Sequence, residues 1–306
     1  MKVFLAQPRG FCAGVVRAID IVERALQLYG APVYVLHEIV HNQKVLADLT
    51  AKGAIFVETL NDIPKGAHTI FSAHGVSEKI VAQASRQNLA ILDASCPLVT
   101  KVHLQSKQYE KEGHTVVIVG HQGHPEVEGI RGNLNNCYVV DSVAEVADLP
   151  DSAERSYAYV TQTTLSIDDT RELINALKAK FPSIVGPDIS DICYATQNRQ
   201  SAVKTAAQQA DLVLVIGADN SSNSNRLREV AAAEKEPAYR IQSAADMNPE
   251  WFEGIANVGI SAGASTPEVL VEEVITKLKV LFGATVETLP GKEEKIHFRL
   301  PREIER

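Results

Sequence analysis

A weak internal repeat is the feature that most constrains how this chain can fold. Three times along its 306 residues, a cysteine in a loop is followed by a helical pattern, a short β-rich run and a polar loop rich in His or Asn. The distance from cysteine to polar loop is 29, 28 and 30 residues in the pairs Cys12–His41, Cys96–His124 and Cys193–Asn223. Three unrelated loops are not expected to match this closely, so we predict three similar units.

Each repeat continues with a second helix, a second strand and a second polar loop. The runs typical of strands are residues 33–36, 115–119 and 212–216 before the first loops, and 69–71, 156–160 and 256–260 before the second loops. Helix signals lie between them. Pro97 is suited to the first position of one helix, and Ser77 and Ser166 are suited to cap two other helices. Gly283 is expected to end the last helix.

Strands that alternate with helices form parallel sheets joined by right-handed crossovers. We therefore predict an α/β fold of three pseudo-equivalent units, with small, mostly parallel sheets arranged around a central site. The predicted parts are an N-terminal strand with its cysteine loop, three α/β units and a C-terminal tail with a strand-like run at 295–300, at residues 1–13, 14–96, 97–189, 190–283 and 284–306.

Ligands of such sheets bind beyond the carboxyl ends of the strands. All the polar loops lie at that end, just before the starts of helices, so the three cysteines are predicted to meet at one central site. The alternative is three ordinary α/β units whose cysteines never meet.

Composition narrows the class of partner. The net charge is −8 and the basic residues are scattered, which argues against nucleic acid and against an anionic membrane surface. No apolar run approaches the roughly 20 residues that span a bilayer, and the N-terminus lacks the pattern of a signal or transit peptide. We expect a soluble cytoplasmic protein. The net charge does not exclude a small anionic ligand, which can be bound locally by helix N-termini and polar side chains.

The four cysteines lie far apart and include no Cys-x-x-Cys, so disulfides, zinc ribbons and bacterial ferredoxin spacings are not indicated. Three thiolates can hold a [4Fe–4S] cluster and leave one iron without a protein ligand. A zinc site with three cysteines and a fourth group is the alternative. Cys137 begins a predicted strand rather than a helix, so we interpret it as a packing residue.

The polar loops carry imidazoles, hydroxyls and an amide, which together with helix N-termini are suited to a phosphate or diphosphate. These candidates are His41, His74, His124, Ser221, Ser222, Asn223 and Ser265. Glu126 is the acid of one loop, and two interpretations stay open for it: a proton donor to a leaving oxygen, or a carboxylate that stabilises a first helical turn. Nucleotide and dinucleotide motifs are absent, so any electrons must come from outside.

The motifs resemble those of the 4-hydroxy-3-methylbut-2-enyl diphosphate reductase family. The matching stretches run through nearly the whole chain and begin with residues 8–15, 37–42, 72–77, 94–103 and 123–129. They continue with residues 161–166, 191–196, 220–227 and 262–265. Together they are highly specific, and we see no departure at a functional position.

The resemblance implies an oxidoreductase with a [4Fe–4S] cluster held by Cys12, Cys96 and Cys193. It also implies a substrate diphosphate held by the seven candidates named above, and a proton relay formed by Glu126 and Thr163, with Thr163 also near the substrate. The implied reaction removes the substrate hydroxyl by two electrons and gives isopentenyl and dimethylallyl diphosphate, the last step of the methylerythritol phosphate route to isoprenoids. An external electron donor such as flavodoxin or ferredoxin is expected. The rival hypotheses are a zinc hydrolase of a phosphorylated small molecule and a non-catalytic iron–sulfur sensor.

Overall fold

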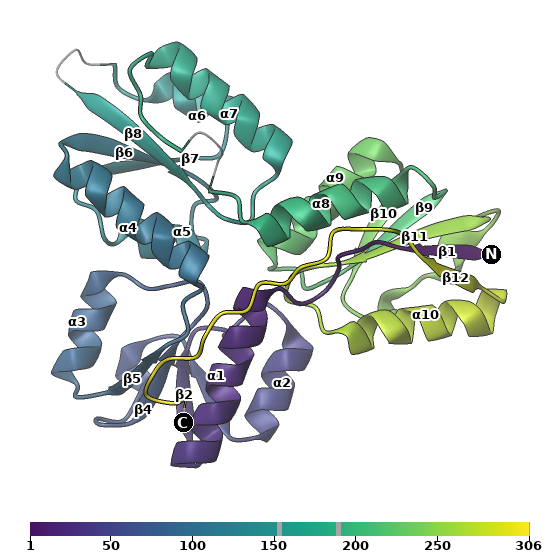
Figure 1. The fold of residues 1–306 in the computed structure, drawn as a ribbon, viewed down its shortest axis with the longest axis horizontal. Helices are drawn as coiled ribbons and strands as arrows, with labels where there is room; N and C mark the ends of the chain where they lie inside the picture. The colour runs from purple at the N-terminus through teal and green to yellow at the C-terminus, as the bar shows by residue number, and fades with distance from the viewer. Residues whose placement is uncertain (152–154, 188–190, 306) are drawn as a thin grey trace. The chain divides into compact units, whose positions relative to one another are not determined.

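The computed structural model in Figure 1 describes residues 1–151, 155–187 and 191–305. The paired strands form three parallel sheets alternating with helices, which confirms the predicted α/β class. The chain divides into two compact units. The first, here called the five-stranded unit, comprises Met1–Val15, His41–Val45 and Tyr194–His297. The second, the two-sheet unit, comprises Val16–Val40, Leu46–Cys193 and Phe298–Arg306.

The five-stranded unit holds one sheet with the strand order β10-β9-β11-β1-β12. Its strands are β1 (Lys2–Leu5), β9 (Leu212–Ile216), β10 (Ala238–Ile241), β11 (Asn257–Ala262) and β12 (Thr285–Thr288). Its helices are α8 (Tyr194–Ala207), α9 (Ser222–Glu234) and α10 (Glu268–Phe282), with short 3₁₀ turns at Ala244–Asp246 and Pro249–Phe252.

Strand β9, in the interior of this sheet, is buried on both faces. Leu212, Leu214 and Ile216 belong to an apolar cluster that includes α10 residues, whereas Val213 and Val215 belong to a cluster that includes residues of α8 and α9. Successive side chains of a strand point to opposite faces, and crossover helices cover both, so a continuous apolar run is the expected sequence of such a strand.

The two-sheet unit holds a four-stranded sheet with the order β3-β2-β4-β5 and a three-stranded sheet with the order β7-β6-β8. The first contains β2 (Val33–Leu36), β3 (Ala54–Val57), β4 (His68–Phe71) and β5 (Ala90–Asp93), and the second contains β6 (His114–Val119), β7 (Cys137–Val140) and β8 (Ser156–Thr161). The accompanying helices are α1 (Ala13–Tyr29), α2 (Gln43–Ala51), α3 (Glu78–Arg86), α4 (Pro97–Lys111), α5 (Pro125–Arg131), α6 (Val143–Asp148) and α7 (Ile167–Lys180), with a 3₁₀ turn at Leu60–Asp62. The starts of α1 and α2 fall in the five-stranded unit.

The predicted helix signals are confirmed. The hydroxyl of Ser77 accepts the Ile80 N–H, and that of Ser166 accepts the Asp169 N–H, at the starts of α3 and α7. Pro97 opens α4, and Gly283 ends α10 with a φ of 60°. None of the helices in the described ranges is long and apolar enough to span a membrane.

The prediction of a strand at 295–300 is wrong. Its alternating pattern suits a strand, but within the described residues the segment joins no sheet. The main-chain carbonyl of Arg299 instead accepts a hydrogen bond from the Arg17 guanidinium, at 2.7 Å from Nε. The last strand is β12, which pairs with β1 at the edge of the five-stranded sheet.

Candidate functional site

The polar loops follow neighbouring strands in all three sheets. The strand pairs that carry them are β2 with β4, β6 with β8, and β9 with β11. Because parallel strands end at the same edge, each sheet brings its two polar loops together at its carboxyl end.

An extended segment leads to each of the three site cysteines and pairs with the strand before a second polar loop. Strand β1 leads to Cys12 and pairs with β11, and β5 leads to Cys96 and pairs with β4. The segment before Cys193 makes a single parallel bridge from Val185 to Ala158 of β8. Each cysteine therefore lies at the end of a segment that pairs with the strand before a second polar loop.

The main-chain N–H of each cysteine donates to the same position of a second polar loop. The acceptors are the carbonyls of Ala264 for Cys12 at 3.1 Å, Ala73 for Cys96 at 3.0 Å and Thr163 for Cys193 at 3.1 Å. These bonds extend the repeat from sequence order to hydrogen bonding, and they hold the three cysteines in equivalent local frames.

The donor set fits thiolate ligands of a cluster. Cys12, Cys96 and Cys193 form no disulfide, are half-buried, and immediately precede α1, α4 and α8. Cys137 differs, because it lies in β7 among apolar neighbours, where burial raises the pKa of its thiol. Its interpretation as a packing residue is confirmed.

The described residues contain no group of three or more His, Cys, Asp or Glu side chains arranged to hold a metal ion. Cys12 belongs to the five-stranded unit, and Cys96 and Cys193 belong to the two-sheet unit. The meeting of the three sulfur atoms stays a prediction.

Glu126 and Thr163 are directly bonded. Glu126 is 2 % exposed at the start of α5. Its carboxyl group accepts the Thr163 N–H at 2.7 Å on Oε1 and the Thr163 hydroxyl at 3.0 Å on Oε2. The neighbouring acid, Glu128, instead accepts the Gly123 N–H at 3.2 Å. The carboxyl group of Glu126 therefore binds the loop after β8.

Burial raises the pKa of Glu126 from 4.5 to about 7. The two hydrogen bonds from Thr163 act in the opposite direction, and the nearby Asp191 carboxylate raises the pKa further. A carboxyl group with a pKa near neutrality can hold a proton at pH 7 and also release it, as a general acid requires.

His74 and His124 lie together in the two-sheet unit. Their rings meet edge to face, with centroids 5.9 Å apart. The Nδ1 atom of His124 accepts the Glu126 N–H at 3.2 Å. In the neutral ring the proton is then on Nε2, which makes that nitrogen a donor suited to an anion. Nδ1 of His74 lies 3.3 Å from the Ser72 hydroxyl.

The remaining candidates lie together in the five-stranded unit. The Ser265 hydroxyl donates to the main-chain carbonyl of His41 at 2.9 Å. The Asn223 side-chain oxygen accepts the Ala264 N–H at 2.9 Å, which joins the loops after β9 and β11. The Ser221 hydroxyl caps α9 by accepting the Ser224 N–H at 3.3 Å. Ser221, Ser222, Asn223 and Ser265 are all buried, so they are held firmly.

Asp191 is a buried residue that the sequence reasoning missed. Its Oδ2 atom accepts the Thr161 N–H at 3.3 Å, and Lys101 lies 3.8 Å from Oδ1. Burial raises its pKa. The sequence repeat carried no signal for this acid, because the residues two before the other cysteines are Gly10 and Ala94, which bond the ends of neighbouring strands through their main-chain N–H groups.

The chain is similar to known proteins over nearly its whole length. The family described as LytB protein matches residues 3–279. Two relatives are the 4-hydroxy-3-methylbut-2-enyl diphosphate reductase 2 of Bradyrhizobium diazoefficiens, 55 % identical over 305 residues and 99 % of both chains, and the reductase 1 of Rhodopseudomonas palustris, 56 % identical over 303 residues and 99 % of both chains.

A solved structure is also similar. It is titled as the E-1-hydroxy-2-methyl-but-2-enyl-4-diphosphate reductase of Plasmodium falciparum, and it is 37 % identical with a TM-score of 0.96, covering 99 % of this chain and 96 % of that one. The resemblance predicted from the motifs is therefore confirmed over almost the full length, and the chain belongs to the LytB protein family.

Proposed function

We propose that this protein is a 4-hydroxy-3-methylbut-2-enyl diphosphate reductase, which produces isopentenyl and dimethylallyl diphosphate in the last step of the methylerythritol phosphate pathway. One observation carries the proposal: a buried Glu126, held by Thr163 and with its pKa raised to about 7, in a chain whose relatives bear this enzyme's name. A reaction that expels a hydroxyl group as water needs such an acid.

Cys12, Cys96 and Cys193 would hold a [4Fe–4S] cluster. The support is that each of these three cysteines stands directly before a helix and that each has the same main-chain bond to a second polar loop, whereas Cys137 begins strand β7. When bound, a cluster with three protein ligands supplies electrons and one iron open to a substrate oxygen.

The diphosphate would be bound by neutral donors rather than by an arginine or lysine clamp. The proposed contacts are His41, His74, His124, Ser221, Ser222, Asn223 and Ser265. The Nε2 donor of His124, which follows from the bond at its Nδ1, and the N-terminus of the 13-residue helix α9 support this assignment.

Glu126 would donate the proton that turns the leaving hydroxyl into water. The carboxylate that remains keeps both hydrogen bonds from Thr163, which stabilise its negative charge. Thr163 lies beside the acid and would also orient the substrate hydroxyl. The balance is two electrons and two protons per substrate: one proton forms water, and the second is added at either end of the allylic system, which gives the two products.

The electrons would come from an external donor such as flavodoxin or ferredoxin, and the protein is proposed to be cytoplasmic. The four cysteines, none of which forms a disulfide, support a reducing compartment.

The test is anaerobic purification followed by iron, sulfide and zinc assays and by turnover with dithionite and the allylic diphosphate. We expect a brown protein with about four irons that converts the substrate to both products. Stoichiometric zinc in a colourless protein would support the rival hydrolase, and a cluster without turnover would support the sensor.

A further inference from the structure

The helices after the three site cysteines each carry one basic side chain within their first two turns. It lies five, five and six residues after its cysteine, in the pairs Cys12–Arg17, Cys96–Lys101 and Cys193–Arg199. The function proposed above assigns no role to these cations. Each of them contacts the chain segment that leads to a different cysteine.

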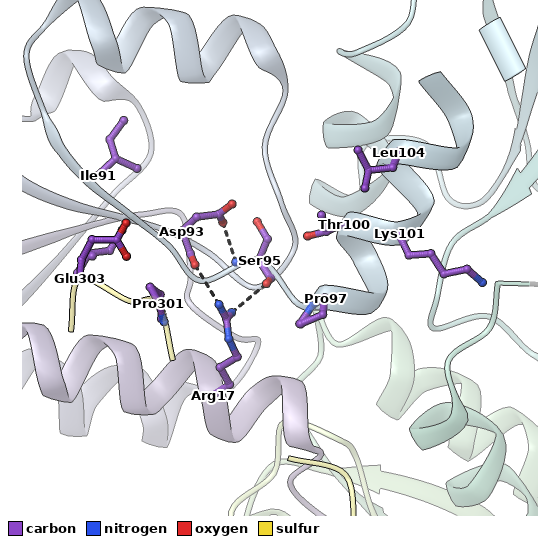
Figure 2. A pocket seen from close by; sticks show the side chains of 11 residues that line it. Arg17, Ile91, Asp93, Ser95, Pro97, Thr100, Lys101, Leu104, Pro301 and Glu303 are labelled. Atoms are coloured by element: carbon purple, nitrogen blue, oxygen red, sulfur yellow. Dashed lines mark hydrogen bonds between the residues drawn. The ribbon is translucent and has the colours of Figure 1, made fainter. Parts of the chain in front are cut away.

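Arg17 contacts the segment before Cys96. Its Nη1 atom donates to the Ser95 carbonyl at 3.0 Å and its Nη2 atom to the Asp93 carbonyl at 3.5 Å, as Figure 2 shows. The same segment is tightened by the Ser95 N–H, which donates to the Asp93 side chain at 2.8 Å. These groups line a cavity of about 630 Å³ beside the start of α4.

Lys101 contacts the segment before Cys193. Its Nζ lies 3.8 Å from Oδ1 of Asp191, which is two residues before that cysteine. The Asp191 side chain is 1 % exposed and the Lys101 side chain 66 % exposed. An ion pair with one solvated partner is weak, so this contact should matter least of the three.

Arg199 contacts the segment before Cys12. It is 1 % exposed, and it donates to the Gly10 carbonyl at 2.9 Å and to the Phe11 carbonyl at 3.0 Å. Its charge is balanced by Glu294, with nitrogen–oxygen distances of 3.1 to 3.2 Å. This is the most extensive of the three contacts.

The contacts follow the order of the cysteines and close into a cycle. The helix after Cys12 bonds the segment before Cys96, the helix after Cys96 contacts the segment before Cys193, and the helix after Cys193 bonds the segment before Cys12. We propose that Arg17, Lys101 and Arg199 are positioning residues that fix the three cysteine loops for the cluster. The inference rests on the proposed function.

The physical reason is that a ligand loop must be held in place by groups outside the metal. Residues that orient metal ligands typically change metal affinity or activity by about 10- to 100-fold when they are removed. Here each arginine binds two consecutive or nearly consecutive carbonyls next to a cysteine, which restricts the main chain that carries the sulfur. An arginine fork can do this, whereas a lysine offers a single charged centre.

The alternative is that Arg17, Lys101 and Arg199 only stabilise the fold, as any side chain that joins a helix to a loop can do. Arg24 provides the matched control, because it is also in α1 and its Nε also donates to a main-chain carbonyl, that of Ile304, at 3.3 Å. It does not contact a cysteine segment through that bond. Lys107 is the control for Lys101, since it lies in the same helix and pairs with Glu78.

The experiment compares full-length proteins purified without oxygen. The variants are Arg17→Gln, Arg17→Lys, Lys101→Gln and the double variant Arg199→Gln/Glu294→Gln, which leaves no unpaired buried charge. The controls are wild type, Arg24→Gln, Lys107→Gln and Glu294→Gln. The readouts are iron and sulfide content, the rate of iron loss to bathophenanthroline disulfonate, the electron paramagnetic resonance spectrum of the reduced cluster, and the melting temperature of each apoprotein.

We expect Arg17→Gln and the Arg199 double variant to lose iron at least about ten-fold faster than wild type, with an altered spectrum. Arg17→Lys should recover only part of this, and Lys101→Gln should show the smallest change. Arg24→Gln and Lys107→Gln should behave as wild type, whereas Glu294→Gln leaves the buried Arg199 charge unpaired and should lower the melting temperature of the apoprotein. Equal iron loss in Arg17→Gln and Arg24→Gln, or iron loss that simply follows the apoprotein melting temperature, would overturn the inference. A wild-type protein that binds zinc instead of a cluster would overturn the proposed function itself.

Discussion

At Glu126, two effects of opposite sign act on the same carboxyl group. Removal from water favours the neutral acid, and the two hydrogen bonds from Thr163 favour the carboxylate. The resulting pKa of about 7 shows that burial prevails. The acid can therefore hold its proton at neutral pH, and after giving it away it finds two donors already in place.

Glu126→Gln should lower turnover by about 100-fold or more, because the amide keeps the shape of the side chain but cannot donate the proton to the leaving oxygen. Cluster content and substrate binding should change little. The matched control is Glu128→Gln, because the Glu128 carboxylate lies in the same helix but accepts a hydrogen bond from the exposed Gly123 N–H. Steady-state turnover of both variants with dithionite checks this, and near-normal turnover of Glu126→Gln would remove Glu126 from the mechanism.

The pH dependence of kcat/KM should report the same group. A general acid works in its protonated form, so with a pKa of about 7 the rate should fall as pH rises above 7. Glu126→Gln should lose this fall, because it has no proton to release. The measurement is kcat/KM between pH 6 and 9 for both proteins; an unchanged profile in the variant would assign the titration to another group.

Cys137→Ser should leave iron content unchanged, since this thiol lies in β7 among apolar neighbours and precedes no helix. Cys96→Ser is the comparison, and it should lose most of the iron, because oxygen replaces a thiolate ligand. Iron and sulfide assays after anaerobic purification decide between them. Loss of iron in Cys137→Ser would break the assignment of three ligands.

At the scale of elements, the local sequence pattern was sufficient to predict a strand where that strand is apolar throughout. The predicted strands 33–36 and 212–216 coincide with β2 and β9, because a buried central strand has a continuous apolar sequence with clear ends. The strands β3, β10 and β12 were not predicted, because they are edge strands with mixed or exposed side chains. Edge strands are recognised mainly by their partners, which are distant in sequence.

The pairing of the cysteine segments could not be predicted from the local sequence pattern either. The motifs identified Cys12, but its main-chain partner Ala264 is separated from it by most of the chain. Hydrogen-bond register between such distant segments depends on the assembled sheet. The same reason explains why the contacts of Asp191 and Arg199 were missed.

Gly75→Ala should disturb the loop that carries His74. Gly75 has a φ of +77°, and an added Cβ would lie 3.1 Å from the ring of buried His103. Left-handed backbone costs an alanine about 1–2 kcal/mol, and overpacking adds about 1–3 kcal/mol. We expect lower stability and a raised KM for the diphosphate substrate.

Gly66→Ala is the matched control, because Gly66 has the same φ of +77° and an added Cβ would meet nothing within 4 Å. It should show only the backbone cost and a normal KM. Urea unfolding of the apoproteins and substrate titration separate the two effects. Equal stability loss and equal KM in both variants would show that contact with His103 does not position the loop.

At the scale of the whole molecule, the repeats exchange strands. The chain begins with β1, yet β1 lies between β11 and β12 in the sheet of the third repeat. Likewise Cys96, which opens the second repeat, follows β5 of the first sheet. Each cysteine therefore joins two repeats, its N–H bonding one and its helix beginning the next.

The end of the chain contributes to the fold although residues 280–306 lie outside the family match. In the two-sheet unit, Ile304 is fully buried, and its carbonyl and that of Arg299 accept hydrogen bonds from Arg24 and Arg17 of α1. The last part of the tail, residues 298–305, is thus a structural part of this unit despite having no regular secondary structure after β12 among the residues described.

Ile304→Ala should therefore lower the free energy of unfolding by about 2–4 kcal/mol, because it removes buried methyl and methylene groups and leaves a cavity. Ile296→Ala is the control: this side chain belongs to the same tail but is 42 % exposed, so its loss should cost well under 1 kcal/mol. The measurement is urea unfolding of the two apoproteins beside wild type. Equal stability of the two isoleucine variants would show that burial of Ile304 does not stabilise the two-sheet unit.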